Sequence, residues 1–143
     1  MPSFNDYAFV DICEGMTVSN DYRIDRTVYE SFLAAFADRS PIHVDDDYAQ
    51  ALGFQGRVMH GAILNGFLSH FIGMHFPRRR ALLLSSDIRY SKPSYFGDAI
   101  QLESTVSQKV ESQRVLVLDV IFRNQTQGIV VARGRVQVAV RDE

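Results

Sequence analysis

The sequence predicts an α+β fold in which a curved antiparallel sheet wraps around one central hydrophobic helix. Two observations carry this prediction. Apolar residues cover most of the circumference of a helix expected over residues 61–75, and four long segments after Pro77 are rich in β-forming residues at a period of two. A curved antiparallel sheet packed on one enclosed helix accounts for both observations, and it is one of several α+β arrangements that would do so.

Length and composition agree with one domain spanning residues 1–143. The chain has 143 residues, of which 46% are hydrophobic and 22% are charged. This length is sufficient to bury a substantial core, and this composition is ordinary for a globular protein. No internal repeat, low-complexity segment or Pro/Gly/Ser-rich linker marks a domain boundary.

Charge and cysteine content exclude several classes of protein. The formal net charge is -2, whereas nucleic-acid binding usually requires a broad basic field. The lone cysteine, Cys13, excludes an internal disulfide and a cysteine-based zinc site, and it fits a reducing compartment. Residues 1–15 lack the features of a signal peptide, and the longest apolar stretch, 62–76, is too short to span a bilayer. We therefore expect a cytoplasmic protein whose partners include neither nucleic acid nor a membrane.

The first half of the chain is expected to place a rigid loop between helices. Pro41 cannot continue a preceding helix and restricts Ser40 to extended conformations, so residues 38–43 should form a fixed loop. Asp45 is suited to cap the helix that follows, and Gly53 to end it. The expected elements, in order, are a strand over 16–24, a helix from 25 or 26 to 37 and a short helix over 46–52.

The second half is expected to hold the central helix and the remaining strands. Gly66 and Gly73 allow that helix to be packed closely on several sides. The short segments 111–114 and 124–128 are typical of hairpin connections, so the strands that they join should be antiparallel neighbours. These strands are expected over residues 81–90, 99–110, 115–124 and 129–140.

A carboxylate and an imidazole, those of Asp38 and His43, flank Pro41 in the segment ADRSPIH. Taken singly, a carboxylate at a helix end is usually a cap or a solvated charge, and a lone histidine is usually structural. About one turn apart on a rigid loop, the two can hold one water molecule between them. General acid–base addition to an activated double bond requires such an arrangement.

The segment MHGAILNGFLS, residues 59–69, contains the start of the expected central helix. A helix that begins near Gly61 presents free backbone N–H groups and the positive end of its dipole, which suit a carbonyl oxygen that gains negative charge. The alternative is that Gly61 merely relieves crowding at the helix start.

The stretch ADRSPIHVDDDYAQALGFQGRVMHGAILNGFLS resembles the catalytic segment of the MaoC-like (R)-specific enoyl-CoA hydratases, and PSYFGD (93–98) is similar to their Pro-x-x-x-Gly-Asp turn. The resemblance covers nearly the whole chain. Two positions depart from the motif: Ala37 stands where glycine is usual, and Ser40 where asparagine is usual. A serine hydroxyl still donates and accepts hydrogen bonds, and Ala37 matters only if its position needs a positive φ. The matching residues are Asp38, Pro41, Ile42, His43, His60 and Gly61.

This resemblance implies a single hotdog fold and a lyase that adds water reversibly and syn to a trans-2-enoyl thioester, giving the (R)-3-hydroxyacyl product of fatty acid metabolism. It implies Asp38 as base and His43 as acid, the N–H of Gly61 as donor to the thioester carbonyl, and Ser69 and Ser40 as further substrate-binding residues. For Ser69, a packed small residue without a role in binding is the open alternative. It also implies a coenzyme A or acyl carrier protein thioester as substrate, no cofactor, and a homodimer or dimer-based oligomer.

Two other functions stay open, an acyl-thioester hydrolase of the same fold and a non-catalytic subunit that binds acyl thioesters. The Asp38–His43 pair favours the hydratase. No metal is expected, because His70 and His75 are five residues apart and do not share a helical face. Arg78, Arg79 and Arg80 fit either the phosphates of coenzyme A or a solvated corner, and His60 is expected to have a supporting rather than a catalytic role.

Overall fold

A computed structural model describes residues 7–141 and contains one five-stranded antiparallel sheet. The sheet order is β1-β3-β4-β5-β2. All five strands agree with the sequence prediction to within one residue at each end. Their bounds are Thr17–Arg23 (β1), Ala81–Tyr90 (β2), Ala99–Val110 (β3), Val115–Asn124 (β4) and Ile129–Val140 (β5).

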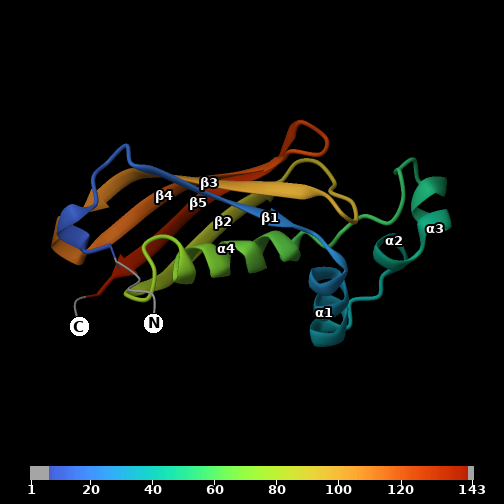
Figure 1. Ribbon diagram of the computed structural model, residues 1–143, viewed down its shortest axis with the longest axis horizontal. Helices are drawn as coiled ribbons and strands as arrows, with labels where there is room; N and C mark the ends of the chain where they lie inside the picture. Colours follow the sequence, from blue (N-terminus) through green and yellow to red (C-terminus); the bar gives the residue numbers. More distant parts are fainter. Residues whose placement is uncertain (1–6, 142–143) are drawn as a thin grey trace.

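One long helix, α4 (Ala62–Met74), lies along one face of this sheet, and three shorter helices stand together beyond the end where α4 begins (Figure 1). These are α1 (Arg26–Phe36), α2 (Pro41–Val44) and α3 (Asp46–Ala51). A short 3-10 turn over Phe9–Asp11 was not predicted from the sequence. None of the helices within residues 7–141 is long and apolar enough to cross a membrane.

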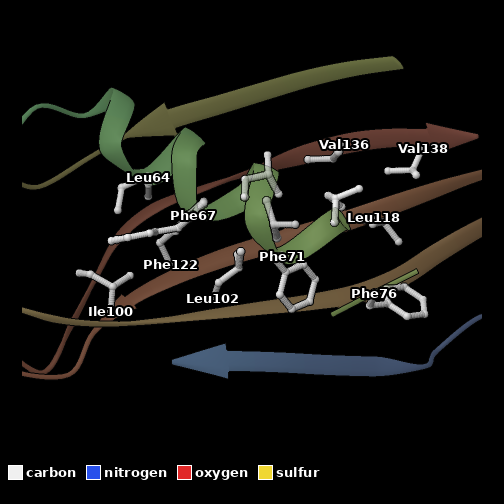
Figure 2. Close-up of a cluster of buried hydrophobic side chains, with 14 of the residues drawn as sticks. Leu64, Phe67, Phe71, Phe76, Ile100, Leu102, Leu118, Phe122, Val136 and Val138 are labelled. Atoms are coloured by element: carbon white, nitrogen blue, oxygen red, sulfur yellow. The ribbon is translucent and has the colours of Figure 1, made fainter. Parts of the chain in front are cut away.

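The core lies between α4 and the sheet. Figure 2 shows Leu64, Phe67 and Phe71 of α4 directed at the strands, where they meet side chains from β3, β4 and β5. Each buried side chain of this size stabilises the fold by roughly 1.5–3 kcal/mol. The prediction of a central helix packed against the sheet is therefore confirmed. Burial of that helix on several sides is not, because its opposite face is exposed at Gly66, Ser69 and Gly73, and no other part of residues 7–141 lies close enough to contact a Cβ on either glycine. The strand residues labelled in this cluster are Ile100, Leu102, Leu118, Phe122, Val136 and Val138, all buried.

Strand β2 forms one edge of the sheet and is largely uncovered. Its successive leucines, Leu82, Leu83 and Leu84, are 50%, 41% and 50% exposed. Native proteins usually cover, charge or shorten an edge strand, because its unpaired backbone groups attract another strand. The apolar β2 edge, residues 82–84, is therefore an exposed hydrophobic surface on an unpaired strand of the single chain.

The predicted loop over residues 38–43 proved partly helical. Pro41 occupies the first position of α2, and its carbonyl accepts the N–H of Asp45 at 2.9 Å. Proline is favoured at this position, because its fixed φ suits a helix and its missing N–H would have no partner there. His43 therefore projects from a turn of helix, while Asp38 lies in the irregular segment between α1 and α2.

Ala37 ends α1 in the left-handed conformation, with φ 54° and its N–H bonded to the carbonyl of Leu33 at 2.9 Å. The family motif carries glycine at this position. The positive φ that favours glycine there is therefore also adopted by Ala37. A non-glycine residue in this conformation costs roughly 1–2 kcal/mol, because Cβ crowds the following carbonyl.

We expect Ala37→Gly to raise the free energy of unfolding by about 1 kcal/mol, since the relief of that crowding exceeds the added chain entropy. Thermal unfolding followed by circular dichroism would measure it. Ala34→Gly is the matched control, because Ala34 is exposed inside the same helix, where glycine lowers stability by roughly 0.5–1 kcal/mol. A lower melting temperature for both variants would contradict the account of Ala37.

Candidate active site

Asp38 and His43 face each other, as their spacing predicted. Asp38 Oδ2 lies 3.8 Å from His43 Nε2, too far for a direct hydrogen bond but close enough for one water oxygen to contact both atoms. The Asp38 side chain is 51% exposed and that of His43 only 19%. The pair thus combines a carboxylate open to solvent with an imidazole enclosed by the fold.

The His43 ring is held in one tautomer. Its Nδ1 lies 2.8 Å from the carbonyl oxygen of Val58, and a carbonyl can only accept, so Nδ1 carries the proton. In the neutral ring this leaves Nε2 bare and directed at Asp38. The Tyr29 hydroxyl also donates to the His43 carbonyl at 2.5 Å, which fixes the backbone of α2 as well as the ring.

Asp38 is held through its backbone and its carboxylate. Its Oδ1 accepts the backbone N–H of Ser40 at 3.2 Å, and its carbonyl oxygen lies 2.8 Å from His60 Nε2. Ser40 therefore orients the carboxylate with its main chain, while its own side chain makes no capping bond at the start of α2. A contact between the Ser40 hydroxyl and a substrate stays a prediction.

A cavity of about 320 Å³ opens beside His43 and His60. Most of its wall is apolar, so it suits an extended hydrocarbon group with a polar end at the imidazole. The apolar wall residues are Ile24, Phe54, Val58, Met59, Leu64 and Pro93.

Gly61 lies on the wall of this cavity, immediately before α4. The backbone N–H groups of Gly61 and Ala62 have no acceptor among residues 7–141, whereas the next two amides of the helix are bonded. A Cβ on Gly61 would come within 3.2 Å of the Tyr90 ring. Packing alone thus explains the glycine, while the free amides supply a donor site that a bound oxygen can use.

Ser69 lies two turns further along α4, where its side chain is exposed and is not part of the cavity wall. The structure of the single chain therefore does not bring Ser69 together with Asp38 and His43. A substrate contact from Ser69 stays a prediction.

The opposite wall of the cavity is fixed by a buried polar cluster in the PSYFGD turn. Asp98 is 5% exposed, and its Oδ2 accepts the N–H of Tyr95 at 2.9 Å and the side-chain amides of Asn124 and Gln127 at 2.6 and 2.9 Å. A buried carboxylate with three donors is well satisfied. The PSYFGD turn also holds the segment before α4, since the Ser94 carbonyl accepts the N–H of Met59 at 2.9 Å.

Asp38, His43 and His60 each offer a possible metal-ligand atom, all within 4.8 Å of one another. The two imidazole rings, however, are stacked with 4.1 Å between centroids and 29° between planes. The lone pairs of stacked rings point along nearly parallel planes, whereas a bound zinc ion needs them to converge at about 2.0–2.1 Å. The three side chains therefore do not form a metal site in this arrangement.

A second group of polar rings lies further along α4, apart from the cavity. The hydroxyl of Tyr22 and Nδ1 of His70 are hydrogen-bonded at 2.9 Å. Burial raises the pKa of Tyr22, although a hydrogen bond with the Asn20 side chain opposes this. Desolvation lowers the pKa of His75, and the nearby His70 and Arg78 act in the same direction.

The sequence is similar to one protein family and to several characterised proteins. The sequence model of the family described as MaoC like domain matches residues 13–125. An (R)-specific enoyl-CoA hydratase from Rhodospirillum rubrum is 32% identical over 138 residues, which cover 92% of this chain and 90% of that protein. A 3-hydroxybutyryl-CoA dehydratase from Methylorubrum extorquens is 25% identical over 114 residues, covering 80% and 73%.

Solved structures share the fold. An R-hydratase from Pseudomonas aeruginosa has a TM-score of 0.85 at 24% identity, covering 94% of this chain and 86% of that one. An (R)-hydratase from A. caviae has a TM-score of 0.83 at 22% identity, covering 91% and 98%. This likeness shows the hotdog fold that the sequence resemblance implied.

Proposed function

The chain belongs to the MaoC-like domain family, and from this premise we propose that it is a hydro-lyase that hydrates trans-2-enoyl thioesters to (R)-3-hydroxyacyl thioesters. The observation that carries the proposal is the Asp38–His43 pair, 3.8 Å apart beside an apolar cavity. The names of the relatives agree with it, since they include (R)-specific enoyl-CoA hydratases and a 3-hydroxybutyryl-CoA dehydratase.

The reaction needs one base and one acid on the same side of the substrate. The ionised Asp38 carboxylate takes a proton from the water molecule while the water oxygen forms a bond to C3 of the substrate. His43, in its protonated form, gives the Nε2 proton to C2, where the electron pair of the broken π bond arrives. Asp38 is then protonated and His43 neutral. Transfer of that proton across the 3.8 Å gap, directly or through water, restores both groups.

The thioester carbonyl is placed at the start of α4. Negative charge develops on its oxygen as water adds to C3, and the free N–H of Gly61 donates to that oxygen. The positive end of the α4 dipole acts in the same direction. The acyl chain then occupies the apolar part of the cavity, between Leu64 and Met59.

Coenzyme A is the proposed carrier of the acyl group, with acyl carrier protein as the alternative. The relatives that match this chain over most of its length are named for CoA substrates. A mitochondrial 3-hydroxyacyl-[acyl-carrier-protein] dehydratase from Arabidopsis thaliana matches over only 63 residues. We propose, as part of the same function, that the protein acts in the cytoplasm and in fatty acid metabolism.

Incubation of the purified chain with crotonyl-CoA tests the function. A hydratase consumes the absorbance of the conjugated enoyl thioester without releasing a free thiol, and chiral analysis of the product should give the (R)-3-hydroxy form. Release of free coenzyme A would instead identify a thioester hydrolase. Binding with neither reaction would identify a non-catalytic acyl-binding subunit.

We also propose that two copies pair along the β2 edge. The support is the row of exposed leucines on an unpaired edge strand, which a second copy of β2 can cover through backbone hydrogen bonds.

Light scattering is expected to give a particle of about 32 kDa, twice the 16.2 kDa of one chain. Leu84→Lys should shift the mass toward one chain, because it places a charge on the β2 edge. Leu52→Lys is the matched control, since Leu52 is 57% exposed and lies at the end of α3, away from β2. A 16 kDa particle for the unmodified chain would refute the dimer.

A further inference from the structure

His60 connects the two members of the dyad. Among residues 7–141, it is the one side chain with both a hydrogen bond to Asp38 and a ring contact with His43. Its Nε2 lies 2.8 Å from the Asp38 carbonyl oxygen, and its ring stacks on that of His43 with 4.1 Å between centroids. We propose that His60 is a positioning residue that sets the separation between Asp38 and His43. This inference rests on the proposed hydratase function.

The protonation of His60 follows from its partner. A carbonyl oxygen accepts only, so Nε2 carries the proton and Nδ1 of the neutral ring is bare. Nδ1 is buried and has no hydrogen-bond partner among the described residues, in a side chain only 3% exposed. A buried acceptor without a donor costs free energy that an apolar ring of the same size would avoid. The bond from Nε2 to Asp38 is the feature that a histidine supplies here and a phenylalanine does not.

The surroundings of His60 make the connection rigid. Phe32 lies against the ring with 4.5 Å between centroids, and Tyr29 lies at 6.1 Å. Tyr29 also donates a hydrogen bond to the backbone of His43, so one of the two side chains that enclose His60 also fixes its partner in the dyad. A displacement of the His60 ring therefore moves Asp38, through its carbonyl, relative to His43.

Two substitutions separate the bond from the stacking. His60→Phe keeps a flat ring against His43 and Phe32 but removes the donor to Asp38. His60→Gln keeps a donor at the reach of Nε2 but removes the ring. Because a displacement of about 1 Å in a catalytic group can cost 10²-fold in rate, we expect His60→Phe to lower kcat by about 10- to 100-fold with KM changed several-fold less.

His60→Gln is expected to recover a large part of that loss, although it packs less well. The loss caused by His60→Phe should also shrink several-fold when Asp38 is already Asn, because the residue acts through the carboxylate. Steady-state kinetics with crotonyl-CoA, and melting temperatures for every variant, provide the measurements.

Near-unchanged kcat in His60→Phe would overturn the inference. Equal losses of kcat in His60→Phe and His60→Gln, in proportion to their losses of melting temperature, would also overturn it. Such a result would indicate that His60 contributes only through packing. An inactive unmodified chain would instead overturn the proposed function. In that case, a crystal structure of His60→Phe tests the inference, which requires the separation of 3.8 Å to change.

Discussion

Asp38→Asn and His43→Ala are each expected to lower kcat for crotonyl-CoA hydration by about 10²-fold or more, the usual size of a general acid–base contribution. The amide cannot take a proton from water, and alanine cannot deliver one to C2. The double variant should lose much less than the product of the two single losses, because the two groups act on one water as a unit.

Asp47→Asn is the control for this experiment, since Asp47 is an exposed carboxylate on neighbouring α3 that lies outside the dyad and the cavity wall. It should leave the kinetics unchanged. Substrate affinity in Asp38→Asn should also be retained in large part, because the proposed mechanism assigns the acyl chain to the cavity and the carbonyl to Gly61. Hydration at nearly the unmodified rate by both single variants would remove the dyad from the mechanism.

Phe67→Asp is expected to prevent folding. Phe67 is 7% exposed and packs from α4 onto the sheet, with the Tyr22 ring stacked on it at 4.6 Å between centroids. An unpaired charge in this position costs several kcal/mol, a large part of the stability of an ordinary domain. Circular dichroism should show loss of the cooperative thermal transition. The milder Phe67→Ala should remain measurable, with a loss of roughly 3–5 kcal/mol.

The same substitution at an exposed phenylalanine provides the comparison. Phe36 is 70% exposed at the end of α1 and contacts the Phe32 ring, so Phe36→Asp should cost about 1 kcal/mol or less. If Phe67→Asp melted like Phe36→Asp, α4 would not be the central buried helix.

Patterns that repeat along the chain were sufficient to predict the fold. The strands are long and, apart from β2, their side chains largely alternate in burial. Helix α4 carries a broad apolar face because it packs along the sheet. Asp38 and His43 could be paired from sequence because only four residues separate them. The helical turn of α2 was missed, since proline was interpreted as a break rather than as the first residue of a helix.

The contacts that complete the site join residues distant in sequence, and no local pattern reports them. Nothing in the local sequence singles out Tyr29, yet its hydroxyl fixes the His43 backbone. The backbone carbonyl of Val58 sets the His43 tautomer. Because every residue type has such a carbonyl, the sequence cannot reveal this contact. His60 was expected to have a supporting role, but its two contacts depend on how α4 meets the α1–α2 segment.

The short gap between Asp38 and His43 also bears on the chirality of the product. Two groups 3.8 Å apart reach a flat enoyl group from one side, so hydroxyl and hydrogen arrive on the same prochiral face whichever face is presented. The dyad therefore does not itself choose between enantiomers. In the proposed mechanism, that choice belongs to the parts that orient the plane of the substrate, namely the amide of Gly61 at the carbonyl and the apolar wall along the acyl chain. Enantiomeric purity and catalytic rate are thus assigned to different residues of the same small cavity.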